Sequence, residues 1–154
     1  MQEVKAEYMA QKRTDSHEQN LAIKRLIEKG YISNVVKNDS LHAKLEWTFS
    51  FGNLVFHYEG SSTPVDFSKY RVRLIYRPNK KGNEKIKVFI DEPVLAKKKH
   101  FWQDGSLCLW KGGNFQWKKG MNIEKDLFPS ICTWIYHYEK WIETGIWHGE
   151  EAEH

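Results

Sequence analysis

The feature that most restricts how this chain can fold is a two-residue alternation of apolar and polar side chains between residues 45 and 90. It is clearest over residues 45–51, where Leu, Trp, Phe and Phe occupy every second position. Similar runs cover residues 54–58, 70–76 and 86–90, and the turn signal Gly52-Asn53 separates the first two runs. Because sequential strands with short connections usually pair with their neighbours, we expect a four-stranded antiparallel meander.

Helical periodicity flanks this region on both sides. Ser16 and Gln19 fit a capping box, and apolar residues then recur at three- and four-residue steps, which predicts a first helix over residues 17–29. A broader apolar stripe begins near Asp126 and ends at Gly145, which predicts a long C-terminal helix.

The 154 residues suit one domain, and no repeat or linker interrupts them. Residues 1–15 show no clear period, so we expect a loose N-terminal lead-in. Residues 146–154 form an acidic tail with two histidines. We therefore expect a single α+β domain over residues 1–154.

Composition argues against several classes of protein. No apolar run approaches the roughly 20 residues that span a membrane, and the N-terminus lacks the apolar stretch of a signal peptide. Two cysteines without framework spacing indicate free thiols in a reducing, cytoplasmic setting. The net charge of +4 comes with short lysine clusters and no basic stripe, so nucleic-acid binding is not favoured. The charged tail has no repeated ligand spacing, so we expect no metal site and no cofactor.

The segment between the last strand and the last helix, residues 91–122, has no sustained period. A loop this long in a compact domain is usually functional. It contains Gly105, which permits a tight turn, and Cys108 three residues later. We expect Cys108 to be reactive, with a thiolate favoured by the basic run at residues 97–99, although a small buried hydrophobe is the alternative. Cys132 lies inside the last helix and should belong to the core.

Residues 105–109, Gly-Ser-Leu-Cys-Leu, resemble the active-site segment of ubiquitin-conjugating enzymes, where a glycine lies three residues before the catalytic cysteine and an aliphatic residue follows it. His100 resembles the histidine of that family's His-Pro-Asn motif, and Trp117 resembles its tryptophan soon after the cysteine. The resemblance covers about residues 16–145. It implies the family's UBC-like fold: an N-terminal helix, a four-stranded meander, an active-site loop and a long C-terminal helix.

Two departures from that family matter. Phe101-Trp102 follows His100 in place of Pro-Asn, and the interval from histidine to cysteine is two residues shorter than usual. The asparagine credited with oxyanion support in the family therefore has no counterpart. One long aromatic helix replaces the paired C-terminal helices of eukaryotic members. This pattern resembles the compact bacterial members of antiviral defence operons that also encode cyclic-oligonucleotide synthases, the CBASS systems.

The resemblance implies a cysteine acyltransferase that works as a thioester carrier. Cys108 would accept the activated C-terminal glycine of a ubiquitin-like protein or of the cyclic-oligonucleotide synthase (CD-NTase) and transfer it to an amine, with backbone amides near Cys108 stabilising the oxyanion. Because the chain has no glycine-rich phosphate loop, a separate activating enzyme is an implied partner. Two alternatives stay open: a catalytically idle binding module of this fold, or a cysteine hydrolase that uses Cys108 with His100 as base.

Other residues of the loop are candidates for supporting roles. His100 either orders the loop backbone or takes part in the chemistry directly. Asp104 either forms a turn with Gly105 or orients an incoming lysine. Asn114 either supplies the missing amide donor or is a turn residue beside two glycines. We expect Trp117 and the other loop tryptophans to pack the loop and not to stack on bases.

Overall fold

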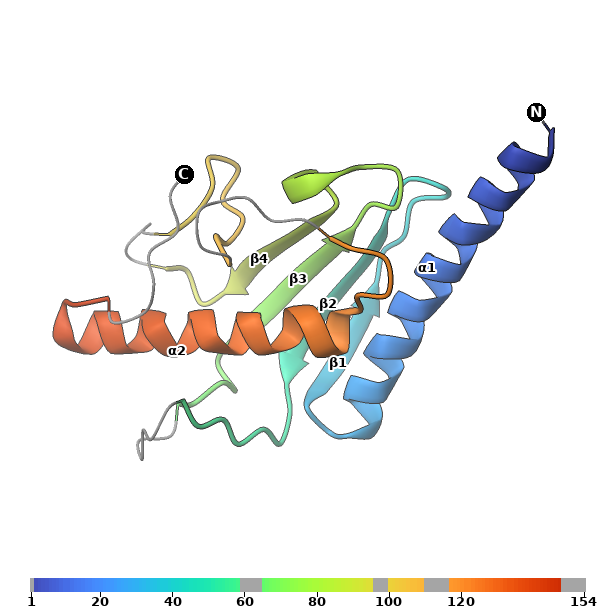
Figure 1. Ribbon diagram of the computed structural model, residues 1–154. Coiled ribbons are helices and arrows are strands. Elements are labelled where there is room, and N and C mark those ends of the chain that lie inside the picture. Colours follow the sequence, from blue (N-terminus) through green and yellow to red (C-terminus); the bar gives the residue numbers. More distant parts are fainter. Residues whose placement is uncertain (1, 59–64, 96–99, 110–116, 148–154) are drawn as a thin grey trace.

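The computed structural model describes residues 2–58, 65–95, 100–109 and 117–147, with side chains described from residue 15 onward. It is an α+β arrangement in which one α-helix precedes and one follows, in sequence, a four-stranded antiparallel sheet (Figure 1). The helices are α1 (Gln2–Glu28) and α2 (Phe128–Thr144), and the strands are β1 (Ile32–Lys37), β2 (Leu45–Phe51), β3 (Arg71–Tyr76) and β4 (Ile86–Glu92). Figure 1 shows α2 lying across the sheet, whereas α1 extends away from the body at its N-terminal end.

Helix α1 begins far earlier than the capping box predicted. It starts at Gln2, so the expected lead-in over residues 1–15 and the N-cap at Ser16 are both wrong. The physical reason is intrinsic propensity, because residues 2–13 are rich in Glu, Lys, Gln, Ala and Arg and contain neither glycine nor proline. The C-terminal end is close to the prediction: the helix stops at Glu28, and Gly30 adopts φ 75°.

The sheet is a meander in the order β1-β2-β3-β4, as predicted, but its first strand is not one that the alternation indicated. Strand β1 escaped the pattern because Asn34 adopts φ 51° and the register with β2 shifts between Ser33 and Val36. The resulting bulge breaks the period of two.

The predicted strand over residues 54–58 is absent, and Gly52-Asn53 is not a hairpin turn. The amides of Gly52 and Asn53 instead donate to the carbonyls of Tyr31 and Gly30, at 2.8 Å each. A Cβ on Gly52 would lie 2.3 Å from the Gly30 oxygen, so only glycine allows this close approach. The chain is thereby tied to the end of α1 and leaves the sheet.

The core lies between the inner face of the sheet and α2. Its largest fully buried side chains include Trp47 and Phe49 of β2, Leu74 of β3, and Ile131 and Ile135 of α2. Cys132 is 2% exposed within this cluster, so its assignment to the core is confirmed.

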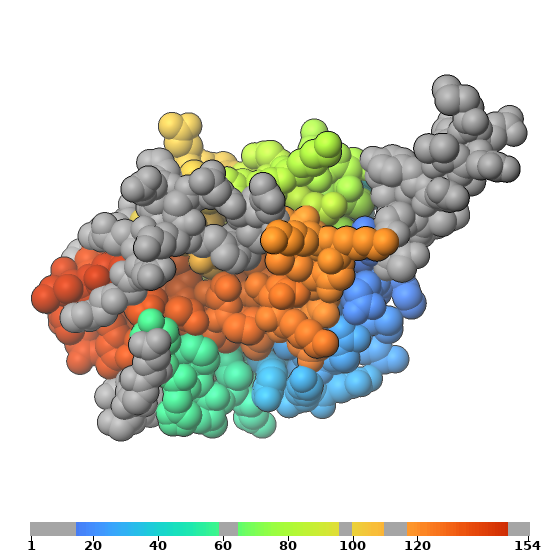
Figure 2. Space-filling model, viewed as in Figure 1, coloured from blue at the N-terminus to red at the C-terminus, as the bar shows by residue number. Residues whose placement is uncertain are grey.

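Helix α2 agrees closely with the predicted C-terminal helix. It follows a π-helical turn over Ile123–Leu127, carries Pro129 in its first turn, and ends at Gly145 with φ 77°. Part of α2 stays at the surface in Figure 2. Within the described part of the chain, no helix is long and apolar enough to cross a membrane.

Candidate active site

The loop that follows β4 closes into a narrow turn at Gly105. Two backbone hydrogen bonds close the turn. The Trp102 amide donates to the Ser106 carbonyl at 2.8 Å, and the Gly105 amide donates to the Trp102 carbonyl at 2.9 Å. Gly105 adopts φ 88°, a left-handed conformation that favours glycine. The tight turn predicted before the cysteine is therefore confirmed.

Cys108 and His100 meet through the backbone on the two legs of this loop. The Cys108 amide donates to the His100 carbonyl at 2.9 Å, and the Leu107 amide donates to Val88 of β4, also at 2.9 Å. His100 is 5% exposed and adopts φ 63°, which is uncommon for a residue with a Cβ. The His100 backbone carbonyl therefore takes part in holding the loop, whereas the roles predicted for its imidazole stay predictions.

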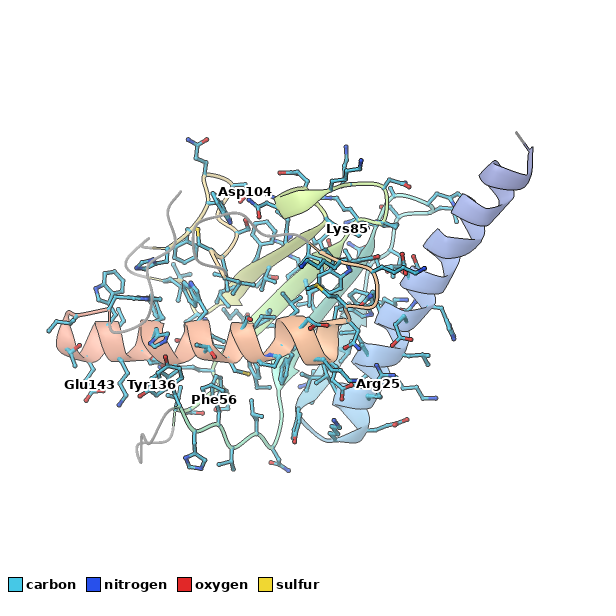
Figure 3. All side chains as sticks on the ribbon, viewed as in Figure 1. Arg25, Phe56, Lys85, Asp104, Tyr136 and Glu143 are labelled. Atoms are coloured by element: carbon cyan, nitrogen blue, oxygen red, sulfur yellow. The ribbon has the colours of Figure 1, made fainter. Side chains whose placement is uncertain are left out.

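Asp104 holds the turn and ties it to the sheet. One carboxylate oxygen accepts the amide (2.9 Å) and the hydroxyl (2.6 Å) of Ser106, and the other accepts the Lys87 ammonium at 2.6 Å. Lys87, on β4, also pairs with Glu84 at 3.1 Å. Burial raises the pKa of Asp104, but the hydrogen bonds from Lys87 and Ser106 outweigh it and hold that pKa at about 2. Of the two predicted roles, the hydrogen bonds from Ser106 show the turn-forming one, and Figure 3 shows Asp104 on this loop.

The amides that precede the thiol are already hydrogen-bonded. Those of residues 106, 107 and 108 donate to Asp104, Val88 and His100, respectively. In this state of the loop these three amides offer an oxyanion no donor, and the expectation of a backbone donor near Cys108 stays a prediction for the amides that follow it.

The Cys108 thiol is buried and protonated at rest. Its residue is 5% exposed, and burial raises the pKa of the thiol to about 11, with the negative charge of Asp104 adding to the rise. The prediction of a favoured thiolate is therefore wrong for this conformation. The lysines at residues 97–99 that motivated it lie outside the described residues.

The remaining candidates divide between packing and the undescribed part of the loop. Trp117 is half-buried and meets Tyr76 edge-on, with ring centroids 6.2 Å apart, which confirms its packing role. Trp102 lines a groove of about 920 Å³ together with Lys87 and Asp104. Asn114 lies outside the described residues.

The sequence decides which family this arrangement belongs to. Residues 36–154, most of the chain and all of the loop, match the family model of the Type II CBASS E2 protein. The chain belongs to the Type II CBASS E2 family. No curated protein and no solved structure matches it.

Family membership gives the chain an E2-like, conjugating role in CBASS in general terms, with an activating E1 enzyme and a CD-NTase as the kinds of partner. The match supports the resemblance seen in the loop sequence, and it extends beyond α2 into the C-terminal segment. It begins at residue 36, so α1 lies outside it.

Two residues of the candidate site were missed by the sequence reasoning. Lys87 gave no distinct signal, because a lysine at a polar position of an alternating strand is ordinarily solvated. Trp147 was assigned to the acidic tail, yet its ring lies on that of His100, with centroids 4.0 Å apart. Its position two residues after the Gly145 cap was the available signal, because apolar residues just beyond a helix cap often pack back onto the helix.

Proposed function

We propose that this CBASS E2 family member is a thioester carrier with a UBC-like fold, in which Cys108 is the nucleophile. The observation that carries the proposal is the placement of Cys108 three residues after a left-handed glycine turn, inside the region that matches the family. The order of helix, meander, loop and long helix supports the UBC-like fold. Both cysteines are free, which suits the reducing cytoplasm of a bacterium.

In the first step, the Cys108 sulfur attacks the carbonyl carbon of an activated C-terminal glycine. The thiol proton leaves to a base, a carbon–sulfur bond forms, and the bond from that carbon to the activating enzyme's leaving group breaks. In the second step, an amine attacks the thioester, a carbon–nitrogen bond forms, and the sulfur leaves and is protonated again. Sulfur suits both steps because it is a good nucleophile and a good leaving group.

The resting state of the loop sets a condition on this chemistry. With a thiol pKa of about 11, roughly one Cys108 in 3,000 is ionised near pH 7.5. We therefore propose that docking of the activating enzyme opens the loop and exposes the thiol to water. Solvation would bring the pKa toward its ordinary value, and ionisation would rise accordingly.

The oxyanion needs a donor other than the three amides that the loop already uses. We assign it to the part of the loop after Cys108, where the Asn114 side chain supplies an amide. This assignment rests on the sequence alone. An Asn114→Ala variant should slow both steps about 100-fold, the usual effect of losing one oxyanion donor.

Trapping the carried protein tests the proposal. A Cys108→Ser or Cys108→Lys variant, incubated with the operon's activating enzyme, ATP and the CD-NTase, should hold a more stable ester or amide. Mass spectrometry of the purified adduct should place it on residue 108, and Cys132→Ser is the matched control. Absence of an adduct with any operon partner would favour the idle binding module. A free acid without an isopeptide bond would favour the hydrolase.

A further inference from the structure

The chain beyond α2 returns toward the active-site loop. Gly145 turns the backbone, and the Thr144 hydroxyl accepts the Ile146 amide at 3.1 Å. In Figure 1 the chain reverses at the end of α2 and runs back over the helix. This reversal brings Trp147 against the loop, although the two segments are far apart in sequence.

Trp147 is fixed on both sides by aromatic rings. On the loop side its ring centroid lies 4.0 Å from that of His100, with the planes 32° apart. On the helix side it meets Trp134 at 5.8 Å and Trp141 at 6.3 Å, both edge-on. Trp147 therefore joins the end of the last helix to the residue that precedes the turn.

His100 needs such a contact because its backbone conformation is unfavourable. A left-handed conformation is unfavourable for a residue with a Cβ, so surrounding contacts must hold it. One contact is the hydrogen bond that its carbonyl accepts from the Cys108 amide. Another is the packing of Trp147 on its ring.

We infer that Trp147 is a positioning residue for Cys108: it packs on His100, fixes the backbone of that residue, and so holds the loop leg that carries the thiol. The inference rests on the proposed function, because it gives Trp147 a role in presenting the nucleophile. It assigns a function to the segment after α2 that is distinct from stabilising the helix end.

The first test measures thiol exposure and needs no partner protein. In a Cys132→Ala background, only Cys108 can react with a small alkylating reagent. We expect Trp147→Ala to be alkylated at least tenfold faster at pH 8, because the loop opens more often. Trp147→Phe keeps an aromatic ring and should stay within about threefold of the parent. Ile146→Ala is the matched control, since the Ile146 side chain is next to Trp147 in sequence but 58% exposed, and it should leave the rate unchanged.

The second test asks whether Trp147 acts through His100. If it does, adding Trp147→Ala to a His100→Ala variant should change the alkylation rate less than twofold, because the contact is already lost. Independent, multiplying effects would overturn the inference. So would an alkylation rate in Trp147→Ala equal to that of the parent.

Folding and function are separated by two further measurements. Circular dichroism and thermal unfolding identify a variant that has not folded; in that case Trp147→Leu, which keeps apolar volume without the ring, replaces Trp147→Ala under the same criteria.

In the transfer assay, Trp147→Ala should slow thioester formation at least tenfold and Trp147→Phe should restore it. An unmodified parent that forms no adduct contradicts the proposed function alone, since the alkylation result stands without it.

Discussion

The two cysteines of this chain are buried to a similar extent, but one lies on a loop and the other in a regular helix. Cys108 is 5% exposed and Cys132 is 2% exposed, and burial raises the pKa of the two thiols to about 11 and about 12. Cys132 lies inside α2, a regular helix packed on the sheet. Cys108 lies on a loop whose bonds reach three separate places: Val88, His100 and, through Asp104, Lys87. Burial and pKa therefore do not distinguish the proposed nucleophile, Cys108, from the core cysteine, Cys132.

What separates the two regions is the free energy needed to expose each thiol. Opening the loop breaks a few hydrogen bonds, each with a net value of about 1 kcal/mol, and the packing of Leu107 and His100, but it leaves α2 and the sheet in place. Exposing Cys132 requires α2 to leave a core that contains the fully buried Ile131 and Ile135, which approaches global unfolding. Local opening is therefore available to Cys108 and not to Cys132.

The largest expected effect contrasts the two cysteines directly. Cys108→Ala should reduce transfer of the carried C-terminal glycine to an amine by at least 1,000-fold, because Cys108 is the only thiol among the described loop residues. Cys132→Ala should keep transfer within about threefold. Both variants should lose about 1 kcal/mol of unfolding free energy, since both thiols are buried. An inactive, folded Cys132→Ala beside an active Cys108→Ala would reverse the assignment.

The second effect concerns His100. We expect His100→Ala to slow transfer by about 10- to 1,000-fold, the span between a lost positioning contact and a lost general base. His100→Asn is the informative companion, because asparagine tolerates the left-handed backbone without supplying an imidazole. Recovery in the asparagine variant would show that His100 acts through the backbone.

A rate measured across pH separates the two roles of His100 further. For a positioning residue, the profile should follow the thiol and the acceptor amine, with no added limb near the ordinary histidine pKa of about 6.5. Wild-type activity in His100→Ala would contradict both roles and would also question the alignment of this residue with the family's histidine.

The sequence was informative where side chains repeat and less so where single contacts decide the backbone. The alternation in β2, β3 and β4 and the stripe of α2 were readable because burial imposes a period. The strand expected over residues 54–58 does not form because the amides of Gly52 and Asn53 donate to the chain just after α1. This is a tertiary contact that no local sequence pattern records. Strand β1 was not predicted because the left-handed conformation of Asn34 interrupts the two-residue period of its side chains.

The candidate site shows the same division. Gly105 and the turn it makes were predictable, since a glycine in that setting has few other uses. The burial of Cys108 was not, because the basic run suggested an exposed thiolate, whereas packing decides the outcome. Trp147 reaches His100 only after the chain reverses at Gly145, and a sequence does not show where the reversed segment lands.

The third effect tests local opening with single-thiol proteins. The Cys132→Ala protein, which keeps Cys108, should be alkylated about 100-fold faster than the Cys108→Ala protein, which keeps Cys132. The Cys108 rate should rise about tenfold per pH unit from pH 7 to 10, because its folded-state pKa is about 11. Equal rates for the two proteins would show that both thiols are exposed by the same global unfolding.

The same pKa fixes the sign of a stability change. The folded state holds the Cys108 thiol at a pKa above the ordinary 9.0, so this group favours folding fully below pH 9. That contribution should be lost as pH rises toward 11. A thermal unfolding series should show the loss in the parent and a smaller one in Cys108→Ala.

The smallest effect concerns the charges beside the loop. Asp104 adds to the raised pKa of Cys108, whereas Lys87 neutralises Asp104. Asp104→Asn should therefore lower the thiol pKa, read from the pH profile of alkylation, and Lys87→Met should raise it. The stability cost of either change should be no more than about 1 kcal/mol, because the Asp104 side chain is 43% exposed and solvent screens the pair.

Both substitutions also loosen the turn, which by itself would lower the thiol pKa in each case by admitting water. Opposite shifts would show that local charge tunes the thiol; two downward shifts would show that the ion pair acts only by keeping the loop closed.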